Sequence, residues 1–123
     1  MKDLFRELWM EMIKETDFGE KLKENGLSIF FMIENPEVAM YVDVHGPLFG
    51  KVAKAQAPAV TMKMSGDILH KFWLNQINVP ESMALRQIRV RGSVIKILQI
   101  LSLLQLGFAI YPNHCKKYNL PVE

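Results

Sequence analysis

The spacing of apolar residues predicts two helices before residue 26. Over residues 3–15 the apolar positions form adjacent pairs that repeat every four residues, which places them on one helix face. This stripe contains Leu4, Phe5, Leu8, Trp9, Met12 and Ile13. We expect it either to dock on its own domain or to pair with a second copy of the chain. A second short helix is expected from Asp17, which can cap it, to Asn25-Gly26, which tolerate the backbone of a helix end.

From residue 27 onward the apolar residues alternate with period two, which predicts β-strands. Strands over 27–34 and 38–44 are expected to form an antiparallel hairpin across the turn sequence Asn-Pro-Glu. Another strand is expected over 59–65. The stretch 48–58 fits either a further strand or a loop, because its pattern is irregular and it contains Gly50.

Helical spacing returns after Ser65, which is expected to cap a helix over 67–76 that has an acidic residue in its first turn. The alternation over 83–91 then predicts a fourth strand. Its arginines fall on the solvent face, except Arg86, which falls on the apolar side. Alternation alone therefore gives four strands, and a fifth depends on the irregular stretch 48–58.

Residues 94–111 form the most apolar segment of the chain, and Ser93 is expected to cap the helix that they form. Their number would permit a membrane span. However, Lys96 and other polar residues recur at every third position, so they sweep around the helix instead of sharing one stripe. Such groups are costly in lipid. We expect a domain helix whose surface faces either a partner chain or an apolar cavity, followed by a polar exit over 111–121.

Composition and charge narrow the classes of function. A chain of 123 residues with one cysteine is expected to form one domain without an internal disulfide. Its first residues lack a signal-peptide pattern, which favours a cytoplasmic protein. A net charge of +2 does not indicate nucleic-acid binding. The basic residues after position 25 fit either a solvated sheet face or an anionic surface contact. Eight methionines suit ordinary packing or a cavity for varied apolar guests.

Residues that could support catalysis or metal binding are few. Asp43, His45, His70 and His114 are the candidates, and nothing in their spacing brings them together. The adjacent pair His114-Cys115 does not have metal-ligand spacing. The chain also lacks a phosphate-binding glycine loop and a triad signature. We therefore expect no enzyme activity, no cofactor and no metal.

Three short motifs then follow one another in a specific order. The segment 40–47, MYVDVHGP, combines a strand with a glycine turn. Met64-Ser65-Gly66-Asp67 joins a strand to a helix, and Arg89-Val90-Arg91-Gly92 joins a strand to the last helix. With these motifs, residues 27–110 resemble the sterol carrier protein two family of small lipid-transfer domains.

The resemblance implies an α+β fold in which a mainly antiparallel sheet of about five strands packs with helices around an apolar tunnel. We expect a single domain over 1–123, with an N-terminal helical segment (1–25), a core (27–110) and a C-terminal tail (111–123). The resemblance further implies non-catalytic binding or transfer of a long apolar lipid: a fatty acid, acyl-CoA, sterol or isoprenoid. The alternative is a dimerising interaction or accessory module of the same fold without a physiological lipid.

The expected lipid site combines the last helix, the helix over 67–76 and methionines of the sheet. An acyl tail buried at about 25 cal/mol per Å² would gain several kcal/mol without any polar contact. The basic strand edge and Lys96 would meet a lipid head group or, transiently, an anionic membrane surface. The expected lining residues are Met40, Met62, Met64, Leu69, Phe72, Trp73, Ile97, Leu98, Leu101 and Leu104.

Overall fold

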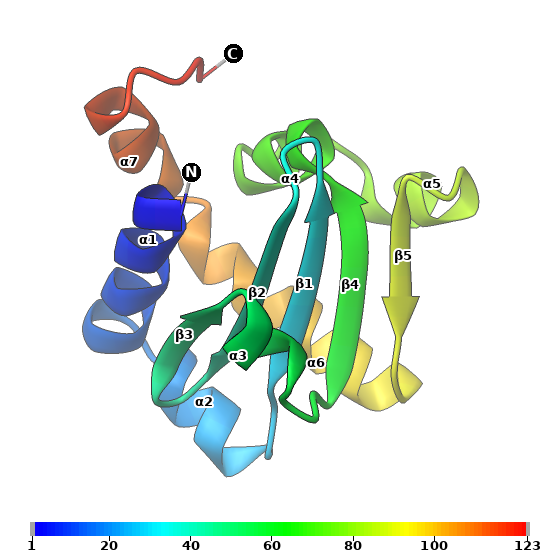
Figure 1. The fold of residues 1–123 in the computed structure, drawn as a ribbon. Helices are drawn as coiled ribbons and strands as arrows, with labels where there is room; N and C mark the ends of the chain where they lie inside the picture. The colour runs from blue at the N-terminus through cyan, green and yellow to red at the C-terminus, as the bar shows by residue number, and fades with distance from the viewer. Residues whose placement is uncertain (1, 123) are drawn as a thin grey trace.

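A computed structural model describes residues 2–122 and contains a five-stranded sheet with the strand order β3-β2-β1-β4-β5 (Figure 1). The strands are β1 Ile29–Glu34, β2 Val38–Asp43, β3 Gly46–Phe49, β4 Val60–Ser65 and β5 Ile88–Arg91. All neighbouring pairs are antiparallel except β1 and β4, which are parallel. The expected α+β fold with a mainly antiparallel sheet of about five strands is confirmed. The parallel pair arises because the chain crosses from the edge strand β3 back over the sheet before β4 begins.

Helices lie around this sheet, with α6 crossing behind it and α1 beside it (Figure 1). The helices are α1 Lys2–Glu15, α2 Phe18–Glu24, α3 Lys51–Lys54, α4 Gly66–Trp73, α5 Val79–Ala84, α6 Val94–Leu104 and α7 Tyr111–Lys117, with a 3-10 turn, η1 Gln105–Gly107. Period-two alternation points every second residue of β1 and β4 toward the helices, so Phe31 and Met62 are fully buried. The apolar face of α1 is also buried, and this helix therefore docks on its own chain.

The expected strand over 83–91 is wrong in its first half. Residues 79–84 form α5, the backbone of Arg86 is left-handed (φ 61°), and the strand begins only at Ile88. The helix forms because the side chain of Asn78 accepts a hydrogen bond from the N–H of Glu81 at 3.0 Å, and because proline is well suited to a first helical turn. Arg86 therefore lies exposed in a turn and not on the apolar side of a strand.

The apolar run 94–111 is not one helix, and the expected polar exit after it is not a loop. The chain turns through η1, and a new helix, α7, begins at Tyr111 and buries both Tyr111 and Cys115. Gly107 permits this turn to approach the core, because a Cβ atom there would lie 2.5 Å from Cζ3 of Trp73. The irregular stretch 48–58 likewise contains the end of β3 and the short helix α3.

Within residues 2–122, no single helix is both long enough and apolar enough to cross a membrane. The stretch Val94–Gly107 together with Tyr111–Lys117 meets those criteria of length and composition only as a pair bent by 52°.

Candidate functional site

The end of α4, the helix α5 and the outer side of α6 enclose an apolar groove of about 590 Å³. Its polar side chains are Asn75 and Gln105, and none of its lining residues is charged. The groove is open on the α6 side, where Val94 and Leu98 remain 71% and 60% exposed, whereas the resemblance implied a tunnel. The lining residues are Phe72, Asn75, Ile77, Val79, Pro80, Met83, Val94, Ile97, Leu98, Leu101, Gln105 and Phe108.

Helical periodicity explains how α6 forms one wall of the groove. Val94, Leu98 and Leu101 recur at steps of four and three, so they share one face of the helix. The first turn is fixed by Ser93, whose hydroxyl oxygen accepts a hydrogen bond from the N–H of Lys96 at 3.2 Å. The expected cap of this helix is thus confirmed, and the apolar stripe starts at the mouth of the groove.

Aromatic rings form the inner end of the groove. Phe72 and Phe108 pack edge to face, with ring centroids 5.4 Å apart. Trp73 lies behind them in the core and contacts both rings, at 5.3 Å and 6.5 Å between centroids. Aromatic pairs of this geometry add stability beyond their area burial. This end of the groove is therefore firmly packed, in contrast to the exposed end at α6.

The structure brings together only part of the residues expected to line a lipid site. Phe72, Ile97, Leu98 and Leu101 line the groove. The other six residues are buried in the core and are not among the lining residues: Met40, Met62, Met64, Leu69, Trp73 and Leu104. The methionines of the sheet therefore pack against neighbouring side chains, which corresponds to the ordinary-packing interpretation of their number.

Sequence reasoning missed the wall of the groove that α5 contributes. Val79 and Met83 of α5 line the groove, as does Ile77 just before it. No helix was expected over 79–84, and Met83 was assigned to the strand over 83–91. The missed signal is the sequence Asn78-Val79-Pro80-Glu81, in which an N-cap residue is followed by proline and then by an acidic residue three positions after the cap. These features together predict the start of a helix.

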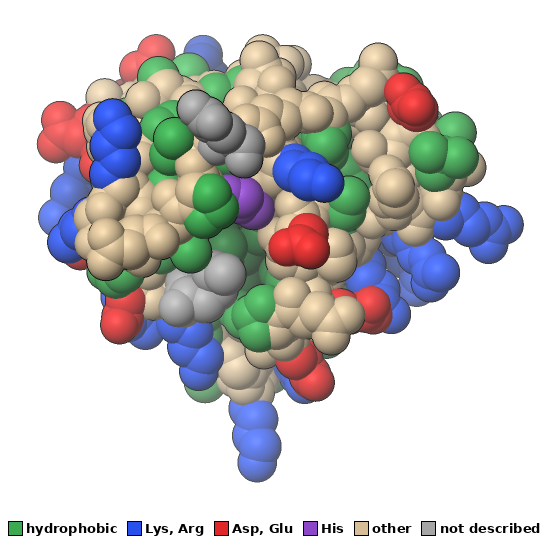
Figure 2. Space-filling model, turned by 90° about the horizontal axis from the view of Figure 1, so that it is seen from above, with side chains coloured by type: hydrophobic (Ala, Val, Ile, Leu, Met, Phe, Trp, Pro, Cys, Tyr) green, Lys and Arg blue, Asp and Glu red, His purple; other side chains and the backbone are tan. Residues whose placement is uncertain are grey.

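Basic side chains lie on the face of the sheet that α6 does not cover. Arg89 faces Lys63 across the β4–β5 pair, and Arg86 joins them around a shallow polar depression. Lys63 pairs with Glu34 at 3.1 Å. Figure 2 shows Lys and Arg side chains projecting beside apolar ones at the edge of the molecule where α5 and β5 lie. The prediction that Arg89 and Arg91 occupy a solvent-exposed face of the strand is confirmed.

The candidate catalytic residues have separate structural partners. His70 lies between the hydroxyl of Tyr111 and the carbonyl of Pro121, each at 2.7 Å. Because a carbonyl can only accept, Nε2 of His70 donates to Pro121, while Nδ1 lies within hydrogen-bond distance of the Tyr111 hydroxyl. His70 thus anchors the C-terminal segment to α4. The carboxylate of Asp43 accepts a hydrogen bond from the backbone N–H of His45 at 2.8 Å in the turn before β3.

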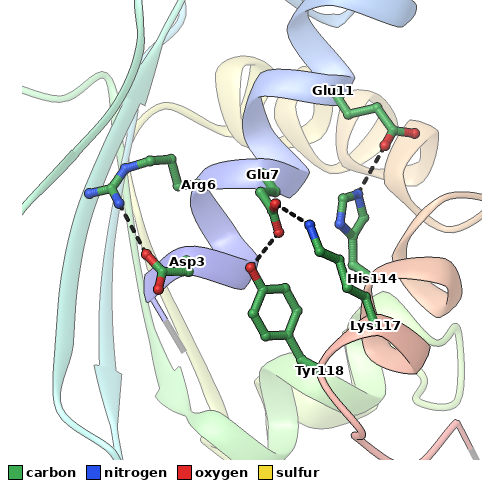
Figure 3. A network of polar contacts seen from close by, with 7 residues as sticks. All are labelled: Asp3, Arg6, Glu7, Glu11, His114, Lys117 and Tyr118. Atoms are coloured by element: carbon green, nitrogen blue, oxygen red, sulfur yellow. Dashed lines mark hydrogen bonds and ion pairs between the residues drawn. The ribbon is translucent and has the colours of Figure 1, made fainter.

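The third histidine belongs to a polar cluster that fastens α7 to α1 (Figure 3). Nε2 of His114 donates to the carboxylate of Glu11 at 3.0 Å. The carboxylate of Glu7 accepts hydrogen bonds from Lys117 and from the hydroxyl of Tyr118. Glu7 and Glu11 belong to an acidic row along α1, in which an acidic residue recurs at every fourth position: Asp3, Glu7, Glu11 and Glu15. The contacts explain part of this row, since two of its members bind side chains from α7 and from the residue after it.

The pKa shifts in this region also have structural causes. The hydrogen bond from Lys117, followed by that from Tyr118, holds the pKa of Glu7 below its ordinary value. The same contacts raise the pKa of Lys117 and of Tyr118. Burial raises the pKa of Tyr111 and of Cys115, so both groups stay protonated at neutral pH. These pKa shifts belong to side chains of α1, α7 and the residue after α7, and none of these side chains lines the groove.

Comparisons with known proteins identify the fold. No family model matches the sequence, and no curated protein matches it. Among solved structures, sterol carrier protein 2 from Yarrowia lipolytica, in its apo form, is similar with a TM-score of 0.65 and 16% identity, over 85% of this chain and 87% of that one. The sterol carrier protein domain 2 of Helicoverpa armigera has a TM-score of 0.63 and 14% identity, over 88% of this chain and 84% of that one.

A third similar structure contains a lipid. Sterol carrier protein 2 from Aedes aegypti, in complex with the C16 fatty acid palmitate, has a TM-score of 0.56 and 15% identity, over 78% of this chain and 94% of that one. The five-stranded sheet and its helices thus define an α+β protein. The chain has the sterol carrier protein two fold, as the motifs over 27–110 implied.

Proposed function

We propose that this chain binds a long apolar lipid in the groove between α5 and α6, as a single domain without catalytic activity. The observation that carries the proposal is the groove itself: about 590 Å³ lined without a single charged side chain. Such a surface binds a hydrocarbon chain by excluding water from both partners. A fold shared with a protein that was solved with palmitate supports the same conclusion.

The groove residues expected to contact the lipid belong to the helices α4, α5 and α6 and to the turn after η1. Leu98 and Leu101 of α6 lie along the chain of the ligand, and Met83 of α5 lies opposite them. Phe72 and Phe108 limit the inner end. Fatty acids, acyl-CoA, sterols and isoprenoids all offer the required apolar surface. The location is proposed to be cytoplasmic, in keeping with a lone, buried and unpaired cysteine.

The proposal is tested by native mass spectrometry of the purified protein, with organic extraction of whatever it carries. We expect a discrete mass increment that is released on denaturation and is identified as a lipid. Leu101→Glu should abolish this increment, since it places a carboxylate in an apolar groove. Leu85→Glu is the matched control, because Leu85 is 63% exposed and lies outside the groove. A bare mass that persists after incubation with added lipids would refute the proposal.

The alternative function is a dimerising or accessory module without a lipid. It cannot use the apolar face of α1, whose residues Leu8, Trp9 and Met12 are fully buried within the chain. The exposed apolar residues at the start of α6 would have to serve instead. Light scattering tests the dimerising form of this alternative, because that form requires a stable dimer and lipid binding does not.

A further inference from the structure

A polar depression of about 380 Å³ lies where β4 ends, α4 begins and the turn after α5 leads into β5 (Figure 1). It is called the Arg86 pocket below. The pocket shares no lining residue with the apolar groove, so it is separate from the proposed lipid site. Its volume falls at the small end of the range of roughly 300–1,000 Å³ that is usual for ligand sites. The lining residues are Glu34, Lys63, Met64, Ser65, Ile68, Arg86, Gln87 and Arg89.

Positive charge dominates the Arg86 pocket, since three cationic side chains and one carboxylate line it. The carboxylate of Glu34 already pairs with Lys63 at 3.1 Å. Within residues 2–122, neither Arg86 nor Arg89 forms an ion pair. Both arginines are exposed. Two guanidinium groups are therefore available to a ligand that enters the pocket.

The register of the sheet brings like charges together at this pocket. Arg89 on β5 lies directly opposite Lys63 on β4 in the antiparallel pair. Like charges at facing positions of such a pair are unfavourable. An anion bound beside both side chains would convert this repulsion into two attractions.

Arg86 has a backbone conformation that arginine rarely adopts. It is the second residue after the end of α5, and its φ is 61°. The N–H of Arg86 donates to the carbonyl of Met83 at 3.1 Å, and the N–H of Gln87 donates to that of Ser82 at 2.8 Å. Glycine or asparagine usually occupies this position at a helix end closed in this way. The other non-glycine residues with positive φ within residues 2–122 are all asparagines: Asn35, Asn75 and Asn119. Arginine is thus unfavourable for the helix end itself, and a function in the pocket accounts for its presence.

The groups around the pocket suit a phosphate. A guanidinium group binds phosphate oxygens through two parallel N–H donors. The hydroxyl of Ser65 accepts a hydrogen bond from the N–H of Ile68 at 3.2 Å, and a hydroxyl that accepts can also donate. A carboxylate, with its single charge, would be satisfied by one arginine alone. None of the exposed large apolar side chains lines the pocket, so it lacks the inserting residue by which proteins bind a bilayer surface.

We propose that the Arg86 pocket binds a phosphate dianion, either free or as the terminal group of a small soluble phosphomonoester. Arg86 and Arg89 hold the phosphate oxygens from the side of β5, and Lys63 adds its charge from β4. The proposal does not rest on the lipid-binding function, because the two sites have no residue in common.

The test is an NMR titration of the full-length, ¹⁵N-labelled protein with inorganic phosphate and with glycerol 3-phosphate, in which sodium chloride keeps the ionic strength constant. We expect saturable shifts of the amide signals of residues that line the pocket, and none at the groove. Tighter binding of glycerol 3-phosphate would identify a monoester as the ligand, and tighter or equal binding of inorganic phosphate would identify the free ion. The proposal is overturned if no shift saturates or if chloride alone produces the same shifts.

Arg86→Gly separates binding from stability. It should weaken binding of both probes about tenfold or more, which is the scale of a lost hydrogen bond to a charged group. The same variant should unfold at a higher urea concentration than the wild type, because glycine suits the left-handed backbone at this helix end. Unchanged affinity would overturn the role of Arg86 in binding. A lower urea midpoint would also count against the proposal, because it would show that the arginine stabilises the fold.

A matched pair of double variants tests whether the pocket or the overall charge attracts the anion. Arg86→Gln/Arg89→Gln is expected to lose roughly 100-fold in affinity, on the same scale per arginine. Lys51→Gln/Lys54→Gln removes the same charge from exposed positions on α3 and should bind as the wild type does. An equal loss in both variants would overturn the pocket.

Two further measurements separate this site from lipids. Sedimentation with phosphatidylcholine vesicles that contain phosphatidic acid tests a phosphate carried by a bilayer. Vesicle binding that depends on Arg86 and Arg89, without binding of either soluble probe, would overturn the proposal. Arg86→Gly should still retain a groove lipid in native mass spectrometry, and Leu101→Glu should still bind phosphate, so failure at one site is distinguishable from failure at the other.

Discussion

Leu98 offers a sharp test of the groove, because a substitution there separates ligand affinity from protein stability. Its side chain lines the groove and yet remains 60% exposed. Leu98→Asn therefore removes little packing from the free protein, and the free energy of unfolding should change by no more than about 0.5 kcal/mol. A ligand that fills the groove, by contrast, covers the exposed part of this side chain.

The exposure of Leu98 sets the size of the effect on binding. Complete burial of a leucine side chain is worth about 1.5–3 kcal/mol. The ligand can cover at most the 60% that is still exposed, which corresponds to about 1–2 kcal/mol. The dissociation constant of Leu98→Asn should therefore rise about 5- to 30-fold. A side chain that was already buried in the free protein would give no such gain on binding.

The assay is titration of the protein with a fluorescent acyl-chain probe, at protein concentrations at which light scattering detects a monomer. The free energy of unfolding is measured in parallel in urea. Leu85→Asn is the matched control, since Leu85 has nearly the same exposure, 63%, but lies outside the groove. Its affinity should equal that of the wild type. An unchanged affinity for Leu98→Asn, or an equal loss in both variants, would show that the ligand does not occupy this groove.

Further predictions concern the stability and reactivity of the fold. Gly107→Ala should lower the free energy of unfolding by about 1–3 kcal/mol, because the new Cβ would lie 2.5 Å from the ring of Trp73, and an unchanged urea midpoint would contradict this packing. The pKa of Glu7 is lowered in the folded state, so its stabilising effect is present above its ordinary pKa of 4.5 and is lost as the pH falls through the folded-state value. The difference in the free energy of unfolding between wild type and Glu7→Gln should therefore shrink in acid. A difference that grows in acid would contradict the lowered pKa of Glu7 in the folded state. Cys115 is fully buried and burial raises the pKa of its thiol, so a thiol reagent should label it slowly in the native state and rapidly in urea, and fast native labelling would exclude this burial.

The polar cluster between α1 and α7 illustrates what local patterns leave out. The acidic row of α1 was visible in the sequence, but its partners His114, Lys117 and Tyr118 lie more than 100 positions away. A row of like charges disfavours an isolated helix. In the folded chain, two of these carboxylates gain partners, and the helix is held by both its apolar face and its polar one.

The sequence by itself determined those elements whose signals are local. The stripe of α1, the alternation of β1, β2 and β4, and the serine caps before α4 and α6 all depend on residues a few positions apart. The parallel pairing of β1 with β4 depends on the tertiary structure alone, because the path of the chain between two strands produces no periodic pattern in the sequence. The tertiary structure also decided that Met62 is buried while Leu98 is exposed in a groove, because burial depends on which distant elements cover a side chain. Periodicity shows which face of a helix or strand is apolar, and only packing determines whether protein, solvent or a ligand covers that face.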